Sequence, residues 1–125
     1  MQDIINRFPP AQLGDVAVFE ACKHLAQRVR EMSGIDSDDK RLMERAFSLK
    51  DPKIRLNALG SATDRAEQQG VMQMASGLWL AVRNPRAHRP AGECDLDETV
   101  ELLTIVSHLH RRLDAAVSVV NASTS

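Results

Sequence analysis

The chain has 125 residues, of which 43% are apolar and 26% charged, and this composition is typical of a globular protein rather than a disordered or fibrous one. Its length corresponds to a single domain. The formal net charge of −1 argues against a broadly basic surface for duplex nucleic acid, so any RNA contact must be local. Cys22 and Cys94 lack the spacing of a zinc site or a disulfide framework, which indicates no metal, no cofactor and a reducing cytoplasm.

No membrane segment is expected either. No stretch approaches the roughly 20 apolar residues of a transmembrane helix, and residues 1–10 lack the apolar run of a secretion signal.

Residues 14–32 predict a first helix, with Asp15 as its N-cap and Ser33-Gly34 as its stop signal. The residues expected on its inward stripe follow steps of four and three: Val18, Cys22, Leu25, Val29 and Met32. Asp38 or Asp39 can cap a short second helix that runs to about Phe47, before Asp51-Pro52 breaks the pattern. A brief turn of helix is expected at residues 53–59.

A third helix is expected at residues 64–82, capped by Ser61 or Thr63. Gly70 and Gly77 inside it suggest close approach of another helix. Because Pro85, Pro90 and Gly92 follow, we expect this helix to end near Arg83 and a loop to cover residues 83–94. The positions expected to face inward are Val71, Ala75, Leu78 and Val82.

Asp95, with Glu98 three residues later, predicts the cap of a long fourth helix that reaches about Val120. Its apolar positions are Leu102, Val106, Leu109, Leu113, Ala116 and Val120. The sequence therefore predicts an all-α, single-domain bundle of four main helices, with a lead-in at residues 1–14, the helical domain at 15–120 and a flexible tail at 121–125.

The segment at residues 83–88 carries the residue types needed to cleave RNA without a metal. That reaction needs a base for the 2′-OH proton, an acid for the 5′-oxygen and a cation for the phosphorane charge. Histidine titrates near neutrality, and arginine directs two donors at phosphate oxygens. Arg83 and His88 lie five positions apart across the expected helix end and Pro85 bend, where they can converge on one phosphate, with Asn84 beside them.

By itself this pair is a weak signal. The alternative is that Arg83 complements the negative end of the third helix while His88 is a surface residue in a turn. On the pair alone, that structural interpretation is favoured about two to one.

The surrounding sequence resembles a known family. Residues 80–88 resemble the signature of the HEPN superfamily, in which arginine is followed by a polar residue and then histidine. Residues 17–23, 42–49 and 63–70 resemble the Ymh-like conserved-hypothetical family of bacteria and phages, and the resemblance extends from about Asp15 to Leu113. Members of that family often carry a further N-terminal region, so this chain is interpreted as a shortened relative.

The resemblance implies a HEPN-like helical bundle that dimerises with its two motifs facing each other. For catalytic members it implies endoribonuclease activity in toxin, abortive-infection or phage-defence systems. Arg83 and His88 then take the catalytic positions, Asn84 and Glu20 support them, and Arg86 and Arg89 contact RNA. The implied partners are an RNA substrate, a second copy of the chain, and a cognate antitoxin or a nucleotidyltransferase-type protein.

The chemistry also favours a symmetric dimer, because one histidine per chain cannot act as base and acid on opposite sides of phosphorus in one turnover. A different class of function stays open, namely a non-catalytic helical module that dimerises or binds a partner. Retention of both Arg83 and His88 favours the enzyme. A third interpretation, a helical DNA regulator, falls well behind, because the chain has no basic recognition helix.

Other polar residues have structural interpretations. Glu20 could orient His88 or Arg83, but a surface pair with Lys23 is favoured about three to two. His24 is expected to be partly buried and Trp79 to lie in the core or a dimer interface. His108 and His110, about 200° apart around a helix axis, cannot bind one metal and are interpreted as surface residues or RNA-backbone contacts.

Overall fold

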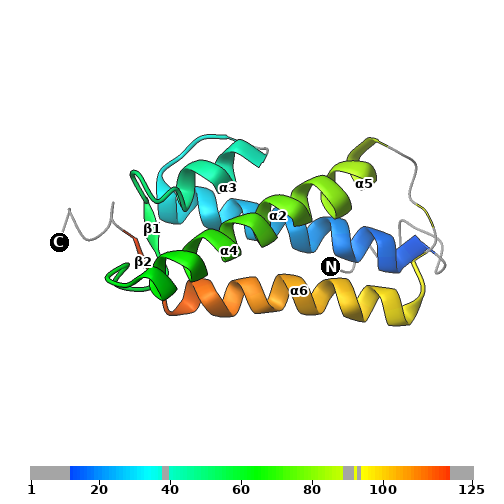
Figure 1. The fold of residues 1–125 in the computed structure, drawn as a ribbon. Helices are drawn as coiled ribbons and strands as arrows, with labels where there is room; N and C mark the ends of the chain where they lie inside the picture. The colour runs from blue at the N-terminus through cyan, green and yellow to red at the C-terminus, as the bar shows by residue number, and fades with distance from the viewer. Residues whose placement is uncertain (1–11, 38–39, 89–91, 93, 119–125) are drawn as a thin grey trace.

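The computed structural model describes residues 12–37, 40–88, 92 and 94–118, except for the side chains of Ala87, His88 and Ser118. Three long helices run along the molecule: α2 (Leu13–Ser33), α4 (Ala62–Leu78) and α6 (Leu96–Asp114). The short helix α3 (Lys40–Ala46) lies beside α2 and α4, and α6 lies along the opposite side of α2 (Figure 1). The prediction of a mainly helical bundle is confirmed.

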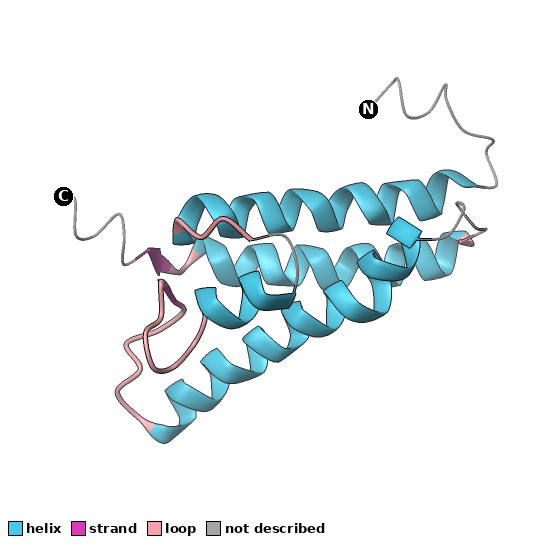
Figure 2. Cartoon of the chain, turned by 90° about the horizontal axis from the view of Figure 1, so that it is seen from above, coloured by secondary structure: helices cyan, strands magenta, loops and turns pink. Residues whose placement is uncertain are grey.

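α4 does not stop where its α-helical hydrogen bonding ends. It continues into the π-helical segment η2 (Trp79–Arg83) and then into α5 (Asn84–His88), so residues 62–88 form one continuous helix. Figure 1 shows this helix crossing α2 at an angle, and Figure 2 shows the two helices approaching each other toward η2 and α5. The predicted end of the third helix near Arg83 is therefore wrong.

The core lies where α2, α3, α4 and α6 meet. It contains the expected apolar positions of all four helices, including Val18, Leu42, Val71 and Val106, each of them buried. Met32, Val82, Leu102 and Ala116 pack at its edge, and Val120 lies outside the described residues. The spacing of apolar residues thus identified the buried faces.

Three predicted helix ends are confirmed in atomic detail. Gly34 has φ 73°, and its N–H donates to the Arg30 carbonyl oxygen. The Ser61 hydroxyl accepts a hydrogen bond from Asp64 N at 3.0 Å, and the Asp95 carboxylate accepts one from Glu98 N at 2.8 Å. The expected caps Asp38 and Asp39 lie outside the described residues.

The first helix begins earlier than expected. Its N-cap is Gln12 and it starts at Leu13, inside the predicted lead-in, so Asp15 falls in the first turn and is not the N-cap. Gly14 allows this start to approach the residues before α6, because a Cβ at Gly14 would lie 2.7 Å from the Cys94 carbonyl oxygen.

The segment after α3 is not helical. Instead of the expected turn of helix at residues 53–59, β1 (Ile54–Arg55) pairs antiparallel with β2 (Val117–Ser118), with Ile54 opposite Ser118. This pairing also ends the fourth helix, which stops at Asp114 rather than near Val120. The buried Gln68 side chain holds the segment: it accepts from Leu56 N and donates to the carbonyl oxygens of Phe47 and Ile54.

The two glycines of α4 have no packing role. A Cβ built at Gly70 or Gly77 would meet nothing within 4 Å, so the predicted close approach of another helix there is wrong within the described chain.

Candidate functional site

The motif at residues 83–88 lies on a locally widened helix. Asn84 N donates to the Trp79 carbonyl oxygen, five residues earlier, instead of to the residue four earlier. In a regular α-helix, proline has no N–H to donate, and its ring clashes with the carbonyl group four residues back. The wider π-helical turn before Pro85 leaves room for the proline ring. Pro85 therefore continues the helix, and this is the physical reason that the predicted break is absent.

Helical continuity changes the geometry of the motif. Five residues along an α-helix correspond to about 140° around its axis, so the backbone does not aim positions 83 and 88 at one point. The predicted convergence of Arg83 and His88 across a bend within one chain is not what the backbone shows. The side chain of His88, and all of Arg89, lie outside the described residues.

Arg86 forms an ion pair and a backbone hydrogen bond within the chain. Its Nε lies 2.7 Å from Asp15 Oδ1, and the two side chains are only 15% and 12% exposed. The Nε–H is not directed at the carboxylate, so the contact is an ion pair rather than a hydrogen bond. Asp15 Oδ2 also accepts from Gly92 N at 2.9 Å, and Arg86 Nη1 donates to the Val82 carbonyl oxygen. This arrangement favours a structural role for Arg86 over the expected RNA contact.

Arg83 is held by aromatic rings instead of a carboxylate. Its Cζ lies 4.4 Å from the centroid of the Trp79 ring and 5.0 Å from that of Phe19. Among the described residues it forms no ion pair, and its buried Nε has no hydrogen-bond partner. Stacking on rings orients a guanidinium without neutralising its charge. Arg83 is thus oriented and remains cationic.

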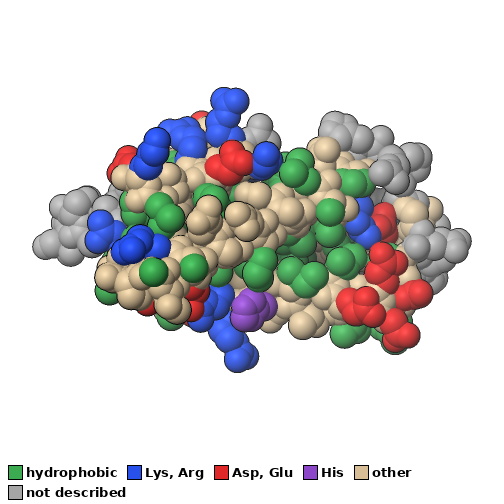
Figure 3. All heavy atoms as spheres, viewed as in Figure 1, with side chains coloured by type: hydrophobic (Ala, Val, Ile, Leu, Met, Phe, Trp, Pro, Cys, Tyr) green, Lys and Arg blue, Asp and Glu red, His purple; other side chains and the backbone are tan. Residues whose placement is uncertain are grey.

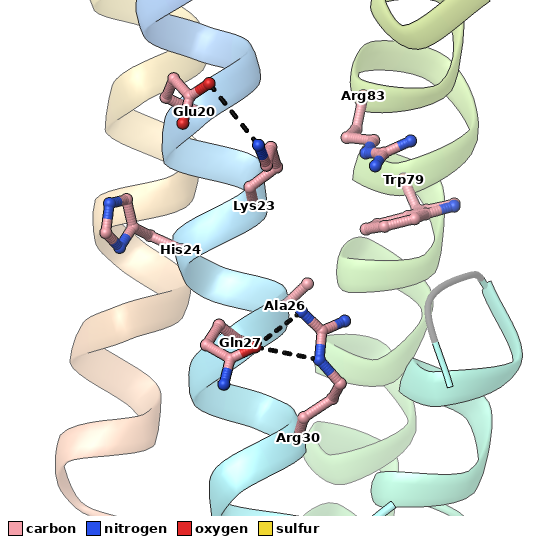
Figure 4. A pocket seen from close by; sticks show the side chains of 8 residues that line it. All are labelled: Glu20, Lys23, His24, Ala26, Gln27, Arg30, Trp79 and Arg83. Carbon is pink, nitrogen blue, oxygen red and sulfur yellow. Dashed lines mark hydrogen bonds and ion pairs between the residues drawn. The ribbon is translucent and has the colours of Figure 1, made fainter. Parts of the chain in front are cut away.

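A hollow of about 440 Å³ opens between α2 and η2 beside Arg83. Figure 4 shows Lys23 and Arg30 on the side of α2 that faces η2, with Arg83 and Trp79 across from them and His24 on the other side of α2. The complete lining is Glu20, Lys23, His24, Ala26, Gln27, Arg30, Trp79 and Arg83.

The favoured interpretation of Glu20 as part of a surface pair is confirmed, because its Oε1 lies 3.7 Å from Lys23 Nζ. Glu20 also lines the hollow with Arg83. Arg30 was missed at the sequence level. The available signal was the spacing of Glu20, Lys23, Gln27 and Arg30, which places four polar side chains on one stripe of α2.

Trp79 lies in the core, as predicted, and is 7% exposed. It also lies between the first hollow and a second one of about 400 Å³, which is lined by Asn84, Leu80 and three residues of α3.

Figure 3 shows basic side chains gathered over α3 and acidic ones near the start of α6. The cationic residues of α3 are Lys40, Arg41 and Arg45, and acidic residues of the first turn of α6 are Asp97 and Glu98.

Burial raises the pKa of the Cys22 thiol to about 11, against the opposing influence of Arg86 and Arg83. Cys22 is therefore a neutral core side chain at physiological pH and not a nucleophile.

His108 is exposed, as expected of a surface residue, but His24 and His110 differ from expectation. His24 is exposed rather than partly buried. His110 is not a plain surface residue, because Arg28 Nη1 lies 3.0 Å from its Nδ1. Burial, and to a smaller extent the charge of Arg28, lowers the pKa of the His110 imidazole.

No cluster of three or more potential metal ligands occurs in the part of the chain that the structure describes. No helix there is long and apolar enough to cross a membrane.

Comparison with known proteins places the chain in one family. The model of the family described as "Protein of unknown function (Hypoth_ymh)" matches residues 11–113, so the chain belongs to that family. No curated protein and no solved structure gives a significant match.

Proposed function

We propose that this member of the Hypoth_ymh family is a HEPN-type ribonuclease that cleaves RNA without a metal, as a symmetric homodimer in a toxin, abortive-infection or phage-defence system. The observation that carries the proposal is the contrast between the two motif arginines. Arg86 is paired with Asp15, whereas Arg83 forms no ion pair within the described residues and lines the hollow between α2 and η2. A preorganised, unneutralised guanidinium is what a phosphorane transition state requires.

In the proposed reaction the 2′-oxygen of the substrate loses its proton to a base and attacks phosphorus. The bond to the 5′-oxygen breaks, and that oxygen is protonated as it leaves. The products are a 2′,3′-cyclic phosphate and a 5′-hydroxyl. Arg83 stabilises the equatorial oxygens, and His88 supplies proton transfer. Asn84 contributes its amide beside the phosphate.

The same geometry supports the proposed dimer. Because positions 83 and 88 diverge around one helix, and because one histidine cannot act on both sides of phosphorus, we propose that each site combines residues of two chains. A monomer at tens of micromolar in sedimentation would contradict this arrangement.

The decisive experiment incubates purified protein with total RNA in EDTA and analyses the product ends. We expect cleavage by the wild type, a loss of at least about 10²-fold in His88→Ala, and a marked loss in Arg83→Lys, which keeps the charge but not the two-pronged donor geometry. Arg65→Lys is the matched control, because Arg65 is an exposed arginine of the same continuous helix. Dependence on Mg²⁺, equal cleavage of DNA, or full activity of His88→Ala would contradict the proposal.

One observation favours the alternative of a non-catalytic dimerisation or binding module. The contacts of Arg83 with Phe19 and Trp79 tie η2 to α2 and give this arginine a structural reason to be present. In that case Arg83→Lys lowers the melting temperature, and no variant changes RNA turnover.

A further inference from the structure

We propose that Asp15 is a positioning residue of the ribonuclease, because its two carboxylate oxygens hold the chain on both sides of His88. This inference rests on the proposed function and assigns His88 a residue that sets its place. Asp15 Oδ1 lies 2.7 Å from Arg86 Nε, two residues before His88. Asp15 Oδ2 accepts from the backbone N of Gly92 at 2.9 Å, four residues after His88. One carboxylate therefore brackets the residue that transfers the proton.

Asp15 is itself placed by the packing of α2 on α6. It lies in the first turn of α2, next to Gly14, whose missing Cβ lets the Cys94 carbonyl oxygen approach. The two helices pack side by side (Figure 1). The carboxylate is thus carried by the packed bundle and not by the motif segment, so it gives that segment a reference point outside itself.

The two contacts of Asp15 have different consequences. Arg86 is a largely buried cation, and the counter-charge on Oδ1 is a matter of stability. Gly92 is an exposed residue, so water is the alternative partner of its N–H. Replacing that water by Oδ2 contributes far less to the free energy of unfolding than the buried pair does. The main effect of the Gly92 contact is that the backbone beyond the motif is fixed relative to α2.

Proton transfer depends steeply on position. A catalytic group must lie within hydrogen-bond reach of the proton that it moves, and a displacement of about 1 Å can cost about 10²-fold in rate. His88 is the last residue of α5, where no following helical turn holds the backbone carbonyl groups. Anchors on both of its flanks supply that restraint.

The first test compares two double variants that differ only in the acceptor for Gly92 N. Asp15→Asn/Arg86→Met removes the ion pair but keeps an amide oxygen that can accept from Gly92. Asp15→Leu/Arg86→Met removes the acceptor as well, with a side chain of similar size. Both variants are assayed below their melting temperatures, and rates are normalised to the folded fraction measured by circular dichroism.

The second test removes the donor and leaves the Asp15–Arg86 pair in place. Gly92→Pro has no N–H at this position. Gly92→Ala is the matched control, because it keeps the N–H and its Cβ meets nothing within 4 Å. Gly92 is also not one of the described glycines with positive φ, so alanine fits the backbone.

We expect Asp15→Leu/Arg86→Met to cleave a fluorescent RNA oligonucleotide with a kcat about tenfold below that of Asp15→Asn/Arg86→Met, at unchanged KM. Gly92→Pro should fall below Gly92→Ala by a similar factor. In NMR relaxation, the ¹⁵N heteronuclear NOE of the His88 backbone amide should drop in the Leu and Pro variants, while that of Val71 in α4 stays constant. A loss of overall stability alone does not produce that local change. Equal normalised kcat values within either pair, or an equal His88 NOE in all four variants, would overturn the proposal.

The same data separate the positioning role from the ribonuclease function. A His88 NOE that depends on the Gly92 hydrogen bond, without any cleavage by the wild type, supports the anchoring by Asp15 and refutes the ribonuclease. Cleavage that is abolished in His88→Ala but equal within both pairs supports the ribonuclease and refutes the positioning role.

Discussion

The ion pair between Asp15 and Arg86 holds the motif segment onto the start of α2, and its removal should be costly. Asp15→Asn keeps the shape of the side chain and removes its charge. Both partners are largely buried, at 12% and 15% exposure, so the variant leaves a desolvated guanidinium without its counter-charge. Breaking a fully buried pair costs about 3–5 kcal/mol. The residual exposure lowers our expectation to about 2–4 kcal/mol.

The loss should be visible in equilibrium unfolding. Urea denaturation followed by circular dichroism should show a lower midpoint with an unchanged slope, and the melting temperature should fall by about 10 °C for a loss near 3 kcal/mol. The double variant Asp15→Asn/Arg86→Met is the informative control. It removes both charges, so its loss should be clearly smaller than the sum of the two single losses.

Two outcomes would refute this reasoning. A loss below about 0.5 kcal/mol for Asp15→Asn would show that the pair behaves as an exposed surface bridge. Additive losses in the double variant would show that the two side chains do not interact in solution.

Three further predictions concern the fold. Gly14→Ala should destabilise by about 1–3 kcal/mol in urea denaturation although alanine favours helix, because the new Cβ meets the backbone oxygen of Cys94; a stabilised variant would contradict this contact. Gln68→Leu should cost about 3–5 kcal/mol in the same assay, because one acceptor and two donor contacts to backbone are lost, and an unchanged midpoint would oppose it. Because the pKa of His110 is lowered in the folded state, the unfolded chain binds a proton at this residue more readily. The contribution of neutral His110 to the free energy of unfolding is therefore fully present above about pH 6.5 and is lost as pH falls through the lower folded-state pKa. Melting temperatures should therefore fall over that range more steeply for the wild type than for His110→Gln, and equal slopes would exclude His110 as the cause.

Local patterns were sufficient to predict the four main helices and their buried faces, but not all of the helix ends. The four-and-three spacing of apolar residues such as Val18, Leu25 and Val106 is a property of the α-helix itself, and it identified the core without any knowledge of packing partners. Caps are also local, because the Ser61 and Asp95 side chains bind backbone three residues away. The motif at residues 83–88 was likewise visible from residue types and family resemblance alone.

The route of the backbone through that motif depended on more than local rules. Proline normally ends a helix, yet the π-helical turn at residues 79–83 lets Pro85 continue it. The strand pairing of Ile54 with Ser118 joins positions 64 residues apart, and no local pattern in either segment predicts it.

The helical class, the core faces, the family resemblance and the candidate residues for phosphate chemistry follow from the amino-acid sequence alone. Which charges remain unneutralised depends on the tertiary structure. Arg83 and Arg86 are three residues apart and chemically identical, but Asp15 in the first turn of α2 faces one of them and the rings of Phe19 and Trp79 face the other. The electrostatic role of a side chain depends on what the fold places within a few ångströms of it, because both Coulomb attraction and desolvation act at that range.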